Sequence, residues 1–261
     1  MRLVSLCPSL TELVFDLGRG PDLVGITKFC VHPAEGVAAV EKVGGTKNPK
    51  LARIAELAPD LVLMNEEENR REDAEALAAA GVRVHSSMPR TPAETAAMVR
   101  DIGALLRRVD AAGRIAGDIE ARSARVRRAA EGQPPVRWAY LIWRGPYMAV
   151  NADTFIDALL RQAGGVNVFG GREERYPVIE PGALAAADPD VVLLSTEPFP
   201  FAERHVAELV GATGLPRDRF RIVDGELLSW HGSRTPRGVD YAERVIADAR
   251  RARHPGAPSA A

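Results

Sequence analysis

One stretch, from Thr91 to about Arg128, constrains the fold of this chain more than any other. It opens with Thr91-Pro92-Ala93-Glu94, a capping box with a proline at the first helical position. Behind this start, apolar residues recur at intervals of three and four, and arginines mostly take the other side. The pattern predicts one long helix with one buried face and one solvent-exposed face. Because glycine weakens a helix interior, a break could fall at Gly113 or Gly117.

The two halves that flank this stretch contain the same sequence pattern. The offset between the copies is constant at 130 positions (197 − 67) and needs no gap. Each copy has a Pro-Asp turn, an apolar strand and a loop that ends on a carboxylate. The copies are Ala58-Pro59-Asp60-Leu61-Val62-Leu63-Met64-Asn65-Glu66-Glu67 and Asp188-Pro189-Asp190-Val191-Val192-Leu193-Leu194-Ser195-Thr196-Glu197.

Short apolar runs alternate with helical segments in both halves, which is the pattern of parallel β-α-β units. We therefore predict an α/β fold with two Rossmann-like lobes, each built on a parallel-type sheet, joined by one long backbone helix. The expected lobes are residues 1–90 and 134–261, and residues 91–133 hold the linking helix. At the start of the chain, Leu3–Leu6 is an expected strand, and Ser9 with Glu12 predicts a capping box for the helix that follows.

Composition excludes several classes of function. The chain has 261 residues, a formal net charge of −1 and no basic run, so nothing points to nucleic acid. No apolar run approaches the roughly 20 residues of a membrane span. The first residues lack the apolar stretch of a secretory signal, and Cys7 has no lipoprotein context. Two cysteines, Cys7 and Cys30, fit either an oxidising or a reducing compartment.

Ligands of open parallel sheets bind beyond the carboxyl ends of the strands, so the loops after the expected strands are the candidate site. Aromatic residues in these loops favour a largely apolar pocket for a large flat ligand, although each ring alone would more often fill a core. They are Phe29, Trp143, Tyr147 and Trp230. A separate candidate loop, Cys7 to Ser9, follows the first expected strand and contributes Ser9.

Enzyme signatures are poor by comparison. The sequence has no phosphate-binding loop, no nucleophile elbow and no zinc-binding helix, so we assign no catalytic residue and no metal site. Cys30 and His32 have the chemistry of a nucleophile and base, or of metal ligands. Without a third ligand or an orienting acid nearby, a structural role is the favoured interpretation.

The acidic loops of the two copies suggest a second kind of site. Glu66, Glu67 and Glu68 are explained well enough as carboxylates that favour a helix N-terminus. That explanation does not cover Glu197 at the matching place in the second half. Two carboxylates in matching positions suit docking onto basic sockets of a two-fold partner.

The order and spacing of several motifs resemble the helical-backbone periplasmic binding proteins, the solute receptors of ABC importers for cobalamin, haem and iron siderophores. The resemblance covers nearly the whole chain and is closest to the cobalamin-binding branch. The motifs are Val4-Ser5-Leu6-Cys7-Pro8-Ser9-Leu10-Thr11-Glu12, Leu23-Val24-Gly25, Phe29-Cys30-Val31-His32-Pro33, Val43-Gly44-Gly45, Pro59-Asp60-Leu61-Val62-Leu63, Gly164-Gly165-Val166-Asn167, and Trp230 ahead of Arg234-Thr235-Pro236-Arg237.

This resemblance implies a monomer with a shallow cleft that binds cobalamin or another metal chelate. It also implies that the protein docks onto a permease dimer through one glutamate per lobe. By position, the cleft aromatics fall on Phe29, Tyr147, Tyr176 and Trp230, with Asn65 in place of a further one. The docking glutamates fall on Glu67 and Glu197, with Glu66 or Glu68 as alternatives to the former.

Two departures from the family pattern keep alternatives open. The expected cleft contains Cys30 and His32, and Asn65 replaces one of its aromatic residues. A receptor for haem or for an iron siderophore is therefore an alternative. The missing signal implies a periplasmic or cell-surface protein if a leader has been removed. If Met1 is the native start, we expect a cytoplasmic protein or enzyme that handles corrinoid or haem with Cys30 or His32 as axial ligand.

Overall fold

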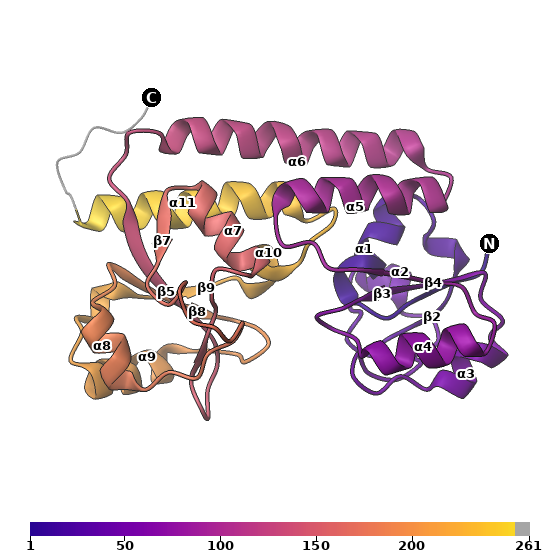
Figure 1. Ribbon diagram of the computed structural model, residues 1–261, viewed down its shortest axis with the longest axis horizontal. Helices are drawn as coiled ribbons and strands as arrows, with labels where there is room; N and C mark the ends of the chain where they lie inside the picture. Colours follow the sequence, from indigo (N-terminus) through magenta and orange to yellow (C-terminus); the bar gives the residue numbers. More distant parts are fainter. Residues whose placement is uncertain (254–261) are drawn as a thin grey trace. The chain divides into compact units, whose positions relative to one another are not determined.

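The computed structural model describes residues 1–253, which form two compact units (Figure 1). Each unit has its own sheet and its own core, and each is described by itself below. Unit 1 consists of Met1–Pro89, Ala93–Asp118 and His231–Arg234, and unit 2 of Arg90–Pro92, Ile119–Trp230 and the chain from Thr235 on.

The sheet of unit 1 is parallel throughout, in the order β2-β1-β3-β4. Every residue of the two central strands is buried, because apolar side chains alternate onto both faces and both faces are covered. A core of Val4, Ile54, Met64 and other residues fills one side. The strands are β1 (Leu3–Ser5), β2 (Leu23–Ile26), β3 (Leu61–Asn65) and β4 (Val84–Ser87), and the helices are α1 (Pro8–Asp16), α2 (Ala34–Val37), α3 (Leu51–Glu56), α4 (Arg71–Ala79) and α5 (Pro92–Leu105), with a 3₁₀ turn at Gly20–Asp22.

The helical stretch after Thr91 is present but is not continuous. It consists of α5 and the 22-residue α6 (Val109–Ala130), and α6 runs through the boundary between units 1 and 2. The break lies at Arg107, whose φ of 55° is left-handed, and not at the two glycines expected to weaken the helix. A Cβ on Gly103 would lie 2.2 Å from the Cβ of Ala112. The two helices therefore meet so closely at the turn that only glycine fits there.

The capping box expected at Ser9 and Glu12 is wrong. Helix α1 begins at Pro8, and its N-cap is Cys7, whose side chain makes no capping bond. Ser9 lies inside the first turn, where its side chain contacts Cys7 and, as described below, the distant His231. The proline at the first position pre-sets the backbone, so the helix starts without a side-chain cap.

The sheet of unit 2 is parallel except for one short edge strand. Its order is β6-β5-β8-β9, with β7 paired to the early part of β5 and β6 antiparallel to β5. The strands are β5 (Val136–Trp143), β6 (Met148–Ala149), β7 (Gly165–Asn167), β8 (Val191–Ser195) and β9 (Phe220–Val223), and the helices are α7 (Phe155–Gln162), α8 (Pro181–Ala187), α9 (Glu203–Thr213), α10 (Gly225–Ser229) and α11 (Thr235–Arg253), with a 3₁₀ turn at Arg217–Arg219.

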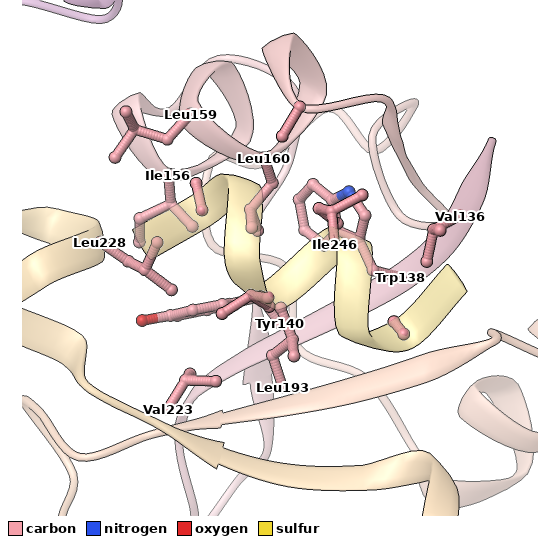
Figure 2. Packing of buried hydrophobic residues seen from close by; sticks show 14 of the residues in the cluster. Val136, Trp138, Tyr140, Ile156, Leu159, Leu160, Leu193, Val223, Leu228 and Ile246 are labelled. Carbon is pink, nitrogen blue, oxygen red and sulfur yellow. The ribbon is translucent and has the colours of Figure 1, made fainter. Parts of the chain in front are cut away.

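Alternation along β5 fills both faces of this sheet. Trp138 and Tyr140 enter one core with residues of α7 and α11, as Figure 2 shows for the side chains around Trp138. Ala139 and Leu141 enter a second core with residues of α8 and α9. Side chains of successive strand residues point to opposite faces, so one strand contributes to two cores.

These features confirm the predicted α/β class with two lobes and parallel-type sheets. The repeated segments Leu61–Asn65 and Val191–Ser195 are β3 and β8, each a fully buried strand of five residues in its own unit. Among residues 1–253, no helix is both long and apolar enough to cross a bilayer.

Candidate ligand-binding and docking sites

The loop after β2 presents an aromatic ring and hides a thiol. Phe29 is 50% exposed, whereas Cys30, the next residue, is 1% exposed. The Sγ atom of Cys30 lies 3.1 Å from Oγ1 of Thr11 and 3.2 Å from Oγ1 of Thr27. The sequence-predicted pair of Phe29 and Cys30 therefore divides into a surface ring and a packed side chain.

Neither cysteine is activated as a nucleophile. Both are unpaired thiols, and burial raises the pKa of Cys7 to about 12 and that of Cys30 in the same direction. A thiol that stays protonated is a poor nucleophile and a poor metal ligand. In the part of the chain that the structure describes, no three histidine, cysteine or acidic side chains are grouped as a metal site would require. His32 lies partly exposed two residues beyond Cys30.

Ser9 and Asn65 meet a histidine that the sequence analysis did not single out. Nδ1 of His231 lies 3.4 Å from Oγ of Ser9, and its Nε2 lies 2.9 Å from Nδ2 of Asn65. All three side chains are buried in unit 1. A hydroxyl, an imidazole and an amide that are linked by hydrogen bonds have the composition of a hydrolytic triad. The protonation of the imidazole decides whether they form an active site or a structural cluster.

The protons are in the wrong places for catalysis. Nδ2 of Asn65 is an amide donor, so Nε2 of His231 must accept, and the ring proton sits on Nδ1, facing Ser9. A base would need the lone pair on that nitrogen. Burial lowers the pKa of His231 to about 4, so the ring is neutral and weakly basic. The cluster is a hydrogen-bonded support and not an active site.

The segment that contains His231 is fastened to α1 at its other end. Arg234 donates from Nε and Nη2 to both carboxylate oxygens of Glu12, at 2.8 and 2.7 Å. The backbone turns between the two anchors at Gly232, whose φ is 104°. Residues 231–234, called the strap below, thus belong to unit 1 although the chain on either side belongs to unit 2.

In unit 2, helix α9 fixes the aromatic turn between β5 and β6. Tyr147 donates its hydroxyl hydrogen to Oε1 of Glu208 at 2.6 Å, and Arg144 reaches the same carboxylate at 2.8 Å. Burial and the Glu208 carboxylate raise the pKa of Tyr147 to about 12. Trp143, 40% exposed, contacts Phe199 edge to face with centroids 5.9 Å apart.

Tyr176 and Trp230 are less exposed than a binding surface of rings would suggest. The segment that contains Tyr176 runs beside the one that contains Tyr147, because Ile179 donates its amide to the Tyr147 carbonyl and Ala149 donates to Pro177. Tyr176 packs partly against the core around Trp138. Trp230 is 9% exposed and is the residue after α10, with its amide bonded to the carbonyl of Glu226 at 3.0 Å.

The two glutamates expected to dock share one local design. Oδ1 of Asn65, the last residue of β3, accepts the amides of Glu67 at 3.0 Å and Glu68 at 3.1 Å. Oγ of Ser195, the last residue of β8, accepts the amide of Glu197 at 3.3 Å. A side chain that binds the backbone two residues on is a typical turn device. Each glutamate is therefore held by the polar residue that ends the preceding strand.

Glu197 borders a hollow of about 450 Å³ in unit 2 that three carboxylates share. The lining residues include Asp224 and Glu226, and no lysine or arginine is among them. Oε1 of Glu197 also accepts a hydrogen bond from Oγ of Ser229 at 2.8 Å. The surroundings of Glu197 are thus acidic and its carboxylate is oriented.

Two α/β units, each with its own sheet and its own core, make up the described part of the chain. A model of the periplasmic binding protein family matches residues 3–211, and the chain belongs to this family. The predicted family is thereby confirmed, as is the prediction of a binding protein rather than an enzyme.

Known relatives span nearly the whole chain. The vitamin B12-binding protein of Vibrio cholerae serotype O1 is 22% identical over 244 residues, which are 94% of this chain and 87% of that protein. The crystal structure of the periplasmic vitamin B12 binding protein of Vibrio cholerae has a TM-score of 0.82 at 21% identity, covering 95% of this chain and 97% of that one. The periplasmic haem-binding protein of Roseiflexus sp. RS-1 has a TM-score of 0.83 at 24% identity, covering 95% and 98%. These structural likenesses establish the fold.

Proposed function

We propose that this protein captures a corrinoid, cobalamin or a close analogue, and delivers it to an ABC importer from the periplasm. The observation that carries the proposal is family membership together with vitamin B12-binding relatives that align over 94% of the chain. The residues proposed to contact the ligand are Phe29, Trp143, Tyr147, Tyr176 and Trp230.

Haem is the second candidate, because haem-binding proteins share the fold with equally high TM-scores. Haem iron usually needs an axial ligand from the protein. The Tyr147 hydroxyl is bonded to Glu208 and resists ionisation, and the Cys30 thiol is buried and bonded. Two of the side chains that could serve as axial ligands are thus already in use, which favours a chelate whose metal is fully coordinated before it binds.

Titration of the purified protein with cyanocobalamin, cobinamide, haemin and a ferric siderophore tests this choice, with binding measured by equilibrium dialysis and metal coordination by visible absorption. We expect saturable binding of the corrinoids with little change in the metal spectrum, since no protein atom would enter the coordination sphere. A Soret shift on adding haemin, lost in Tyr147→Phe or His32→Ala, would instead assign haem. Trp230→Ala should weaken corrinoid binding by about 1–3 kcal/mol through lost apolar contact.

For delivery, we propose Glu67 and Glu197 as the residues that meet the permease dimer. Their support is the shared register and the shared turn device, which hold one carboxylate in each unit. Arginine sockets on a two-fold partner would complement them by charge.

A further inference from the structure

The two neighbours of Trp230 in the chain contact the two docking loops: Ser229 bonds Glu197 itself, and His231 bonds Asn65, the support of Glu67. Within unit 2, Oγ of Ser229 lies 2.8 Å from Oε1 of Glu197 and 2.8 Å from the carbonyl oxygen of Gly225, and its single hydrogen is shared between these two acceptors. Within unit 1, Nε2 of His231 lies 2.9 Å from Nδ2 of Asn65, whose Oδ1 holds the amides of Glu67 and Glu68. Trp230, a proposed ligand contact, is the residue between them.

On the unit 2 side, α10 is packed so tightly against the Glu197 loop that the two must move together. The amide of Gly225, the first residue of α10, donates to Oγ1 of Thr196 at 2.9 Å. A Cβ on Gly225 would lie 2.5 Å from Oγ of Ser195 and 2.9 Å from the amide nitrogen of Glu197. Ser229, the last residue of α10, bonds Glu197 from the other end. A displacement of Trp230, which follows directly, would therefore pull on the loop.

On the unit 1 side, the carboxamide of Asn65 is a rigid planar group that forms hydrogen bonds with three parts of the structure. Its NH₂ donates to the carbonyl of Ser87 at 2.8 Å and to His231, while its oxygen holds the docking loop. If the ring of His231 moved, one amide hydrogen would lose its acceptor in a buried place. Leaving a buried donor unpaired costs about 1–3 kcal/mol. A displacement of the ring is therefore opposed by this cost unless the carboxamide rotates with it.

We propose that Ser229 and His231 are positioning residues that couple ligand binding at Trp230 to the two docking loops, each through its own unit. The inference rests on the proposed function, which assigns the ligand contact and the docking glutamates. Because the tripeptide is continuous, a ligand that favours one placement of Trp230 favours one placement of both neighbours. Coupling is reciprocal, so a partner that holds Glu67 and Glu197 would also change the affinity for the ligand.

Amide hydrogen exchange at Glu67, Glu68 and Glu197 in the full chain, with and without saturating cyanocobalamin, tests the coupling. In the wild type we expect the ligand to change exchange at both loops several-fold. Ser229→Ala should reduce the change at Glu197, where the Gly225 contacts remain, and keep it at Glu67, whereas His231→Leu should reduce the change at Glu67 and keep it at Glu197. The conservative variants Ser229→Thr and His231→Gln keep a donor and an acceptor, respectively, and should restore the wild-type response.

Each contrary outcome has a distinct meaning. Corrinoid binding measured by equilibrium dialysis, with exchange unchanged at both loops of the wild type, would overturn the coupling and leave the proposed function intact. No binding of any corrinoid would overturn the proposed function and the coupling with it. Ser229→Ala that alters both loops equally would overturn the separate routes. The Ser229 side chain lies outside the buried cluster of unit 1, so this arm decides the proposal even if His231→Leu does not fold.

Discussion

Nδ2 of Asn65 and Nε2 of His231 lie 2.9 Å apart although 166 residues separate them in the chain. The bond attaches the strap, which follows Trp230 directly, to the end of strand β3 in unit 1. It also fixes the imidazole as the tautomer with its proton on Nδ1. The same side chain of Asn65 organises the loop that contains Glu67, so one buried pair sets the geometry of a surface turn.

This burial predicts a pH dependence of stability. Burial lowers the pKa of His231 from 6.5, its value in the unfolded chain, to about 4 in the folded protein. Between these values the unfolded chain binds a proton that the folded chain does not. Stability should therefore fall as pH drops from about 6.5 to about 4, by about 3 kcal/mol, and should be unaffected by this group above pH 7.

Urea unfolding of the wild type and of His231→Gln at pH 7.5, 5.5 and 4.5, followed by circular dichroism, isolates this contribution. Glutamine can accept from Asn65 but does not titrate, so the difference between the two proteins should change with pH in the stated direction. Burial also shifts the pKa values of Asp16 and Asp157, but both proteins share these groups. A difference that stays constant across the series would contradict the assignment.

The ion pair between Glu12 and Arg234 should be worth far more than an exposed pair. Arg234 is 9% exposed and reaches both carboxylate oxygens of Glu12. Glu12→Gln removes the carboxylate that Arg234 binds at both oxygens while the nearby Asp16 carboxylate remains, so we expect a cost of about 1–3 kcal/mol. Glu75→Gln removes the exposed pair with Arg71 and should cost less than about 0.5 kcal/mol. Equal effects in denaturant unfolding would show that the strap contributes nothing to unit 1.

Two glycines of unit 2 should respond to alanine in opposite ways. Gly225→Ala places a Cβ 2.6 Å from Cγ of Glu197 and 2.5 Å from Oγ of Ser195, so we expect a loss of about 1–3 kcal/mol from overpacking. Gly211 lies in α9 with open space where its Cβ would be, and Gly211→Ala should gain about 0.5–1 kcal/mol. Thermal unfolding of both variants beside the wild type measures the two signs.

The sequence was informative where local pattern decides structure. The repeated segments could be predicted because a run of apolar residues after a Pro-Asp turn is sufficient to specify a buried strand, and both became one. The break in the long helix could not be predicted from local pattern. Arg107 is a good helix former, and its left-handed backbone follows from the close approach of Gly103 to Ala112, which is a tertiary contact.

The candidate site was predicted in part for the same reason. Ser9 and Glu12 match a capping box, but their side chains are committed to His231 and Arg234 more than 200 positions away. Tertiary bonds overrode the local option. His231 carried no signal of its own beyond its place after Trp230. A pairing over such a separation depends on how the strap folds back, which local spacing does not encode.

Phe29 should be a ligand contact that can be removed without harm to folding. Half of its surface is exposed, so Phe29→Ala deletes little core. We expect an affinity loss for cyanocobalamin of about 1–2 kcal/mol, about 5- to 30-fold, with the midpoint of unfolding nearly unchanged. Val109→Ala at the start of α6 removes an apolar side chain that is 66% exposed and lies outside the proposed site. An equal loss in that control would mean that the effect is not local to the ligand.

Loss of docking without loss of binding is the outcome that would separate Glu67 and Glu197 from the ligand site. Each carboxylate follows the end of a central strand of its own unit and is held through its backbone amide, so Glu67→Ala and Glu197→Ala leave the turn bonds in place. We expect normal cyanocobalamin affinity in both variants, because no ligand contact is removed.

Association with the cognate permease should weaken in each variant and further in the double variant, because each carboxylate would meet a separate arginine socket. If the sockets act independently, the two losses add within about 0.5 kcal/mol. Glu66→Ala and Glu68→Ala are the matched controls in the first loop, since either neighbour could take the role of Glu67. Pull-down or surface binding to the permease in nanodiscs measures the effect. Full association of the double variant would exclude these glutamates as docking residues, and a loss confined to Glu68→Ala would move the unit 1 contact by one position.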